Sequence, residues 1–148
     1  MENLSLDLDT ISHEINMQNF PKIKAYESLL IQLFQNLLSN SIKYRQEDQQ
    51  LKINIECEEN QEFVTFSVTD NGIGIDPSDN KDPFQLFSRL DIAQQFEGTG
   101  LGLSLCKRII LLHNGTISMK SKGLDQGTTI VFNLKKTLNN SLIDSKSN

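Results

Sequence analysis

Apolar residues along this chain fall at two spacings, one typical of helices and one typical of strands. In residues 27–46 the apolar positions form one broad stripe at helical spacing, which predicts a long amphipathic helix. Residues 51–58 alternate apolar and polar side chains, and Val64, Phe66 and Val68 repeat that alternation after the short ENQE connection. We therefore predict a hairpin of two half-buried antiparallel strands.

The second half of the chain shows the same two patterns after a long polar segment. Residues 76–98 hold two prolines and one short apolar cluster, which predicts either a lid or disorder. A helix is expected from about residue 99 to 113, closed by Asn114 and Gly115, with a second hairpin across GLDQG. Residues 1–26 mix both spacings and predict no clear element. Together the patterns indicate one α+β domain over residues 1–136, a two-layer sandwich, with a polar tail at 137–148.

Composition narrows the class of protein but not its chemistry. The net charge of −5 and the pI near 5.0 argue against a surface for nucleic acid or anionic membrane. No apolar run approaches the roughly 20 residues of a membrane span. Cys57 and Cys106 lack the spacing of metal ligands, so a reduced cytoplasmic setting is expected.

Two glycine-rich segments are candidates for chemistry. In DNGIGI, Asp70 ends a predicted strand, and Gly72 and Gly74 follow it. Glycines there would let the backbone approach a flat ligand closely. The Asp70 carboxylate could then accept a hydrogen bond from an exocyclic amine such as that of adenine. The alternative is a turn in which Asp70 caps its own loop. In GTGLGL, glycines open a predicted helix, where free amides and the helix dipole favour anions. The alternative there is a flexible hinge, and the Walker A and Rossmann spacings are both absent.

A polar face on the first long helix is the third candidate. Asn36, Asn40 and Lys43 lie at i, i+4 and i+7, within about 60° of one another around the helix axis. An amide oxygen suits Mg²⁺, which needs few protein ligands, and Lys43 could reach phosphate oxygens. Tyr44 offers a ring for a base or ribose. The alternative is a solvated polar helix edge.

Together these segments resemble the GHKL nucleotide-binding superfamily, and most closely the catalytic ATP-binding domain of bacterial sensor histidine kinases. LFQNLLSNSIKY resembles the N box of that family, DNGIGI its first glycine box, PFQLF its F box and GTGLGL its second glycine box. GLDQGTTI is similar to the glycine-containing segment before the last strand. The segments follow the family order across residues 29–134. The resemblance implies the Bergerat fold, a mixed, mostly antiparallel sheet covered on one face by helices.

The resemblance also implies a role for each matched residue. Asn36, Asn40 and Lys43 would be the catalytic set: Asn40 ligates Mg²⁺, Asn36 helps to hold metal and phosphates, and Lys43 contacts phosphate. Asp70 would accept a hydrogen bond from the adenine amine. The remaining nucleotide-binding residues would be Tyr44 near the adenosine, Gly72 and Gly74 admitting the ring, Phe84 and Phe87 anchoring a lid at 76–98, Arg89 as a phosphate clamp, Gly98, Thr99, Gly100, Leu101 and Gly102 around the phosphates, and Thr128 and Thr129 lining the adenine pocket.

The residue at position 36 separates the reaction classes of the superfamily. Relatives that hydrolyse ATP, and the related serine kinases, usually carry Glu there as a general base, whereas the amide of Asn36 takes no proton. The resemblance therefore implies that the chain binds ATP with Mg²⁺ and donates the γ-phosphoryl group to a histidine, which is already nucleophilic. The alternative is a non-catalytic nucleotide-binding regulator of the same fold. A GHKL serine kinase or ATPase ranks below both.

The acceptor histidine is expected on a separate domain. Only 35 residues precede Asn36, too few for a phosphoacceptor helical hairpin. His13 lies in SHEI without the Arg and Pro that acceptor motifs place after it, so we expect a surface residue on a first strand. His113 is expected to be a helix-dipole partner. The expected partners are a dimeric phosphoacceptor domain of the same kinase and a downstream response regulator, with no nucleic acid and no membrane contact by this segment.

Overall fold

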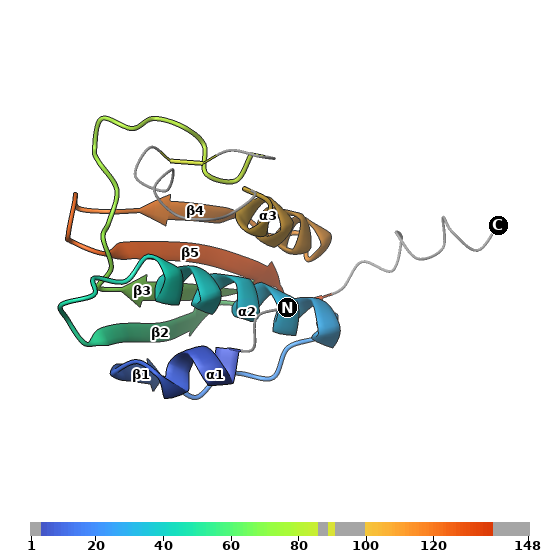
Figure 1. Ribbon diagram of the computed structural model, residues 1–148. Coiled ribbons are helices and arrows are strands. Elements are labelled where there is room, and N and C mark those ends of the chain that lie inside the picture. Colours follow the sequence, from blue (N-terminus) through green and yellow to red (C-terminus); the bar gives the residue numbers. More distant parts are fainter. Residues whose placement is uncertain (1–3, 86–88, 91–99, 138–148) are drawn as a thin grey trace.

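The protein is an α+β sandwich with one five-stranded sheet in the part that the structure describes (Figure 1). The computed structural model describes residues 4–85, 89–90 and 100–137. The predicted phosphate-loop residues Gly98 and Thr99, and Phe87 of the predicted lid, lie outside these ranges. The elements in chain order are α1 (Leu4–Asp9), β1 (His13–Met17), α2 (Glu27–Lys43), β2 (Leu51–Glu59), β3 (Phe63–Asp70), α3 (Gly102–Leu112), β4 (Ile117–Lys120) and β5 (Thr128–Lys135).

The sheet is mixed but mostly antiparallel, in the order β1-β2-β3-β5-β4. β1 pairs with β2 in parallel, and the connection between them contains α2, as a parallel crossover requires. The other pairs, β2 with β3, β3 with β5 and β4 with β5, are antiparallel. Both predicted hairpins are therefore confirmed. In the register of the two central strands, Asp70 at the end of β3 lies opposite Thr128 at the start of β5.

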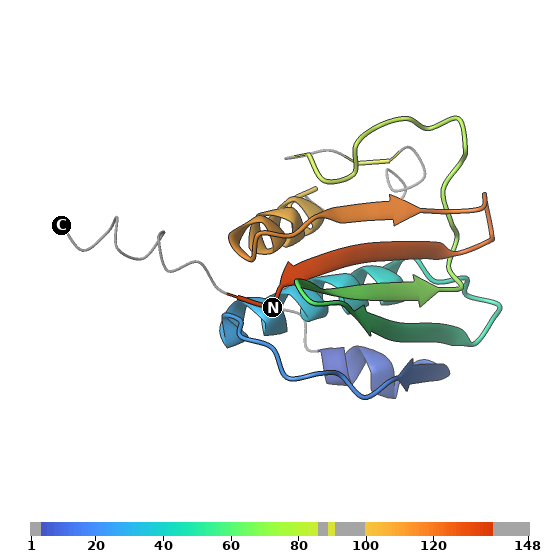
Figure 2. The ribbon, with the colours of Figure 1, turned by 180° about the vertical axis from the view of Figure 1, so that it is seen from behind.

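Helices α2 and α3 cover one face of the sheet, and the view from behind shows the other face uncovered (Figures 1 and 2). The alternation of the strands explains this arrangement, because Val64, Phe66 and Val68 are buried while the residues between them are not. Phe66 and Phe132 stack with ring centroids 5.1 Å apart at the centre of the core. The predicted two-layer sandwich with helices on one face is confirmed.

Helix α2 ends at Lys43, three residues before the predicted end. The carbonyl of Tyr44 accepts a hydrogen bond from the Ile73 amide at 2.9 Å, so this carbonyl is used in tertiary structure. The guanidinium of Arg45 donates to the Ile42 carbonyl at 2.8 Å and satisfies one of the last acceptors of the helix. Gln46 lies beyond the helix and uses its side chain elsewhere. The helix therefore ends where it meets the loop after β3.

Helix α3 ends as predicted at the Asn114–Gly115 pair. Asn114 has a φ of 55°, its amide bonds the Leu111 carbonyl, and the Gly115 amide bonds the Ile110 carbonyl. This pair of bonds is the Schellman motif. The described part of the helix begins at Gly102.

Two elements in the ambiguous first 26 residues were not predicted with bounds. They are the short helix α1 and the strand β1, on which His13 is the first residue and is exposed, as expected. Among the residues that the structure describes, no helix is both long and apolar enough to cross a membrane.

Candidate functional site

Asp70 is the centre of the candidate site and joins three elements. Its Oδ1 accepts hydrogen bonds from the backbone amides of Gly72 at 3.0 Å and Thr128 at 3.1 Å. Its Oδ2 accepts one from the hydroxyl of Ser41, on α2, at 3.1 Å. A carboxylate oxygen has two acceptor positions, so Oδ1 is saturated while Oδ2 keeps one position for a further donor. Asp70 thus caps its own loop, as the turn interpretation predicted, and still offers an acceptor.

Burial raises the pKa of the Asp70 carboxyl, and the bonds from Gly72, Ser41 and Thr128 oppose that rise. All three partners donate, so the surroundings favour the ionised form by hydrogen bonding while burial disfavours it. A desolvated carboxylate gains more from an added donor than an exposed one does. This environment suits the recognition of a neutral amine.

Ser41 is a site residue that sequence analysis missed. Among the described residues, Ser41 and His113 are the two buried polar side chains; Ser41 has 4% of its surface exposed, and its hydroxyl also lies 3.3 Å from the Leu37 carbonyl one turn earlier. The signal was present in the sequence, because Ser41 follows Leu33 and Leu37 on the apolar stripe of the helix, where another apolar residue would be expected. A hydroxyl at such a position needs a buried partner, and Asp70 is that partner.

The glycines of the DNGIGI segment are required by the protein's own backbone. A Cβ at Gly72 would lie 2.5 Å from the Tyr44 carbonyl oxygen, and one at Gly74, which has a φ of 67°, would lie 2.1 Å from the Gly123 carbonyl oxygen. These close approaches account for both glycines without a ligand. Their predicted role in admitting an adenine ring therefore stays a prediction.

A network of hydrogen bonds fixes the loop after β3 against the loop before β5. The Asp125 amide bonds the Ile73 carbonyl at 2.8 Å, and the Gly127 amide bonds the Gly72 carbonyl at 3.1 Å. Gln46 was not predicted to take part, yet its Nε2 lies within 3.2 Å of the carbonyls of Asn71, Gly72 and Asp125. Nothing in the local sequence distinguishes Gln46 from the polar residues beside it. The network therefore fixes the loop that directly follows Asp70.

The predicted polar face of α2 contains Asn36, Asn40 and Lys43, which are all half-buried. Asn36 Nδ2 is buried and has no hydrogen-bond partner of acceptable geometry among the described residues. The neighbouring thiol of Cys106 is buried, which raises its pKa to about 12, although the Asn36 side chain acts in the opposite direction. The Cys106 sulfur, a weak acceptor, is thus the polar neighbour of this amide, and a buried donor without a strong acceptor is uncommon in a folded protein.

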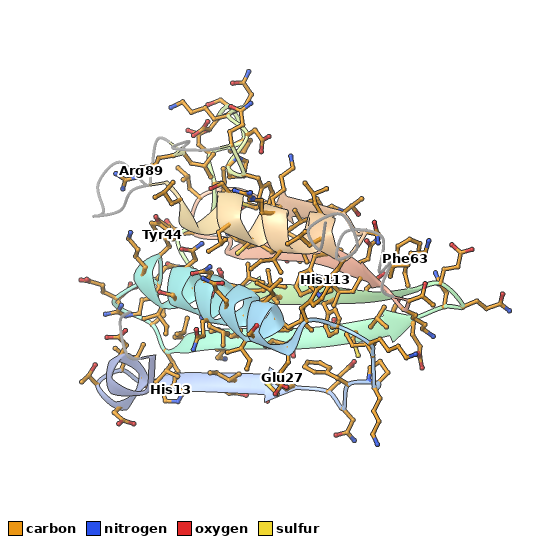
Figure 3. The ribbon with its side chains drawn as sticks, turned by 90° about the vertical axis from the view of Figure 1, so that its right-hand side faces the viewer. His13, Glu27, Tyr44, Phe63, Arg89 and His113 are labelled. Atoms are coloured by element: carbon orange, nitrogen blue, oxygen red, sulfur yellow. The ribbon has the colours of Figure 1, made fainter. Side chains whose placement is uncertain are left out.

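Tyr44, at the end of α2, lies close to two cationic side chains, those of Lys43 and Arg89. Lys43 Nζ is 5.5 Å from the centre of the Tyr44 ring, a cation–π distance. Arg89 also lies close to Tyr44 (Figure 3). Burial raises the pKa of the Tyr44 hydroxyl, and the charge of Arg89 and its hydrogen bond oppose the rise. The structure therefore places two cations of the predicted site next to Tyr44, Lys43 at its ring and Arg89 at its hydroxyl.

The predicted lid is described only in part. Residues 76–85 contain no helix or strand, as predicted, and Phe84 is buried with 8% of its surface exposed. The described phosphate-loop residues are Gly100, with a φ of 73°, Leu101, which is 39% exposed, and Gly102. No described atom lies within 4 Å of a Cβ added at Gly102, so packing does not explain that glycine. An anion cradle at the helix start would explain it.

The structure separates the two threonines that were predicted to line one pocket. Thr128 lies opposite Asp70 and donates its backbone amide to the carboxylate. Thr129 is the next residue on β5, so its side chain points to the other face of the sheet, where Oγ1 lies 3.0 Å from Thr69 Oγ1. Alternation along the strand turns the Thr129 side chain away from Asp70, so its role in an adenine pocket stays a prediction.

The two histidines differ sharply in environment. His113 is 1% exposed; its Nδ1 lies 2.7 Å from the Ile109 carbonyl, and its Nε2 accepts the Tyr26 amide at 3.1 Å. Because Nε2 accepts and Nδ1 donates, the ring is a neutral imidazole that bonds the last turn of α3. His113 thus lies at the helix end as expected, but the bonds rather than a positive charge fix it.

The described residues do not form a metal site by themselves. They contain no group of three or more His, Cys, Asp or Glu side chains that could hold a metal ion. Mg²⁺ keeps several waters and is commonly bound through one or two protein ligands together with substrate phosphates. The unpartnered Asn36 donor and the half-buried Asn40 amide beside it fit such a shared site.

A protein family and several known proteins resemble this chain in sequence. The family described as histidine kinase-, DNA gyrase B-, and HSP90-like ATPase matches residues 25–138. Cyanobacterial phytochrome A from Nostoc sp. is 39% identical over 132 residues, covering 89% of this chain and 17% of the relative. Sensor histidine kinase WalK from Bacillus subtilis is 35% identical over 127 residues, covering 80% of this chain and 20% of WalK.

Solved structures agree with these sequence relatives. The catalytic domain of histidine kinase ThkA, in a nucleotide-free form, has a TM-score of 0.72 and 26% identity, covering 90% of this chain and 87% of that one. This chain spans about a fifth of the length of the two relatives above. The family match covers most of this chain and includes every box quoted above, and the domain of this family implies ATP binding. The chain therefore belongs to the family of histidine kinase-, DNA gyrase B- and HSP90-like ATPases.

Proposed function

We propose that this chain binds ATP with Mg²⁺ and donates the γ-phosphoryl group to a histidine on a separate phosphoacceptor domain, as the catalytic part of a two-component sensor histidine kinase. The observation that carries the proposal is the Asp70 carboxylate. It is held by three donors, keeps one acceptor position on Oδ2 among the described residues, and is bonded to Ser41 of α2, the residue after Asn40. An adenine amine supplies the donor that this position lacks.

The residues on α2 and at the start of α3 form the phosphate side of the proposed site. Asn40 is the proposed Mg²⁺ ligand, with Asn36 beside it on the preceding turn and its buried Nδ2 available to a phosphate oxygen. Lys43 and Arg89, both close to Tyr44, would supply positive charge. The first amides of α3 have no acceptor within the helix and follow Gly100 and Leu101. Bound Mg²⁺ would neutralise phosphate charge during transfer.

The side chain at position 36 favours transfer to a histidine over hydrolysis. The side chain at position 36 is an amide, which takes no proton from water or from a serine hydroxyl at neutral pH. A neutral imidazole acceptor needs no such base. The names of relatives such as WalK and ThkA, both histidine kinases, support the same assignment. A cytoplasmic location and a downstream response regulator follow from the proposal.

The test is transfer in trans. The chain is incubated with γ-labelled ATP, Mg²⁺ and a dimeric phosphoacceptor domain taken from a similar sensor kinase. Acid-labile, base-stable label on the acceptor histidine supports the proposal, and an acceptor with His→Gln at that position is the control. Binding of ATP without transfer to acceptor domains from several such kinases would favour the alternative, a nucleotide-binding regulator without kinase activity.

A further inference from the structure

We infer that Ser41 is a specificity residue of the nucleotide site, which acts by holding Asp70 Oδ2 as an acceptor for an exocyclic amine. The inference rests on the proposed function, because it assigns Asp70 to the adenine base. Ser41 lies within the N-box segment, but the resemblance assigns it no role, and its hydroxyl is 3.1 Å from Asp70 Oδ2.

The geometry leaves Ser41 as the side chain that orients Asp70. Both acceptor positions of Oδ1 are taken by backbone amides, those of Gly72 and Thr128, which no side-chain substitution removes. Among the described residues, the donor to Oδ2 is the Ser41 hydroxyl. Loss of that hydroxyl would free the carboxyl group to rotate about its one remaining anchored oxygen. The spare acceptor position would then no longer be fixed in direction.

The Ser41 hydroxyl is itself held in place. It lies on a well-packed helix, is 4% exposed, and has the Leu37 carbonyl at 3.3 Å as an alternative acceptor for its one proton. A donor confined to two acceptors, one of them charged, spends most of its time on the charged one. Asp70 Oδ2 therefore remains an acceptor, and an amine at position 6 of a purine is favoured over a carbonyl oxygen, which would be repelled.

This mechanism separates Ser41 from a residue that only stabilises the fold. A structural role would weaken every nucleotide equally, since all of them share the phosphates. A role through Asp70 Oδ2 would weaken only nucleotides that carry the amine. Purine riboside triphosphate, which has hydrogen in place of the amine, is therefore the matched ligand for ATP.

The experiment is a calorimetric comparison of these two ligands, each with Mg²⁺, on four folded proteins. They are the wild type, Ser41→Ala, Asp70→Asn and the double variant, with Ser39→Ala as a control that makes the same substitution in the same helix. We expect Ser41→Ala to lower the affinity for ATP about tenfold, the effect of losing one charge-assisted hydrogen bond. The affinity for purine riboside triphosphate should fall less than about twofold. In the Asp70→Asn background, Ser41→Ala should cause no further loss of ATP affinity, and Ser39→Ala should change neither ligand.

The outcomes separate this inference from the proposed function. Suppose that Asp70→Asn lowers the affinity for ATP. If Ser41→Ala then lowers the affinity for both ligands equally, or leaves the affinity for ATP unchanged, the role of Ser41 is overturned and the proposed function is not. Unchanged ATP affinity in folded Asp70→Asn would instead remove Asp70 from the adenine site and with it the inference. Thermal melts of all variants establish that each comparison is made on folded protein.

Discussion

The imidazole of His113 accepts a hydrogen bond from the backbone amide of Tyr26, so the last turn of α3 is joined directly to the first turn of α2. The two rings also pack edge to face with centroids 5.3 Å apart. Both nitrogens of this buried ring are bonded, because Nδ1 lies on the Ile109 carbonyl. The two helices that carry the candidate phosphate site are therefore fixed to each other at the end remote from Tyr44 (Figure 3).

Replacing His113 should destabilise the fold. His113→Ala removes a buried ring and leaves the Tyr26 amide without its partner, so the free energy of unfolding should fall by about 2–4 kcal/mol. His13→Ala, at an exposed position, should change it by less than about 0.5 kcal/mol. Urea denaturation followed by circular dichroism measures both. Equal stability of the two variants would contradict the structural role of His113.

Asp70→Asn should weaken ATP at least tenfold, roughly the effect of losing one hydrogen bond to a charged group, while the protein stays folded. The side-chain oxygen of the new asparagine can still accept hydrogen bonds from the amides of Gly72 and Thr128. Its NH₂ group can donate to the Ser41 hydroxyl, and the Ser41 proton then bonds the Leu37 carbonyl. That NH₂ group would oppose the adenine amine. Calorimetry measures the affinity, and Asp125→Asn, which removes a charge from the exposed loop before β5, is the matched control. Unchanged affinity in the folded variant would rule out the adenine assignment.

Binding of ATP and stability should respond to pH in opposite directions. Because burial raises the pKa of Asp70, the folded protein keeps the proton at pH values where the unfolded chain has lost it. The free energy of unfolding should therefore fall as pH rises from the ordinary aspartate pKa to the raised one. ATP affinity should rise over the same interval, because the carboxylate is the acceptor. Both quantities are measured against pH for the wild type and for Asp70→Asn, because the difference between the two proteins removes the titration of the nucleotide itself. Parallel pH profiles of ATP affinity and of unfolding free energy in the two proteins would contradict the prediction.

Asn40 should govern the response to Mg²⁺. Asn40→Ala should abolish phosphoryl transfer in the trans assay, since the proposed metal ligand is lost. Asn40→Asp should alter the Mg²⁺ dependence, because it adds a negative charge beside the phosphates. Titration of Mg²⁺ at fixed ATP measures both. If nucleotide affinity does not depend on Mg²⁺ concentration in the wild type or in Asn40→Ala, this result would count against the N-box assignment.

The isolated chain should neither phosphorylate itself nor hydrolyse ATP at an appreciable rate. His113 is buried with both nitrogens bonded, His13 is the first residue of an edge strand, and Asn36 supplies no base for water. Incubation with labelled ATP should leave the chain unlabelled and the ATP intact. Stoichiometric acid-labile label that disappears in His13→Gln would show that the chain carries its own acceptor.

The sequence by itself determined the elements with strong periodicity and the order of the motifs. The stripe on α2, the alternation in β2 and β3 and the Asn114–Gly115 end of α3 are local patterns, and local backbone preferences suffice to predict them. The alternation along β5 likewise places the side chains of Thr128 and Thr129 on opposite faces of the sheet. The same local patterns were too weak to predict α1.

Only the tertiary structure decided how the candidate site is held together. Ser41 and Asp70 are 29 positions apart, and Gln46 reaches the Asp125 carbonyl across 79 positions, so neither contact has a local signature. The glycines that looked suited to a ligand are needed where the backbone of Tyr44 and of Gly123 comes close. Such contacts depend on how α2 packs across the ends of β3 and β5. That packing is set by burial of apolar surface from all the elements at once, which no single segment of the sequence contains.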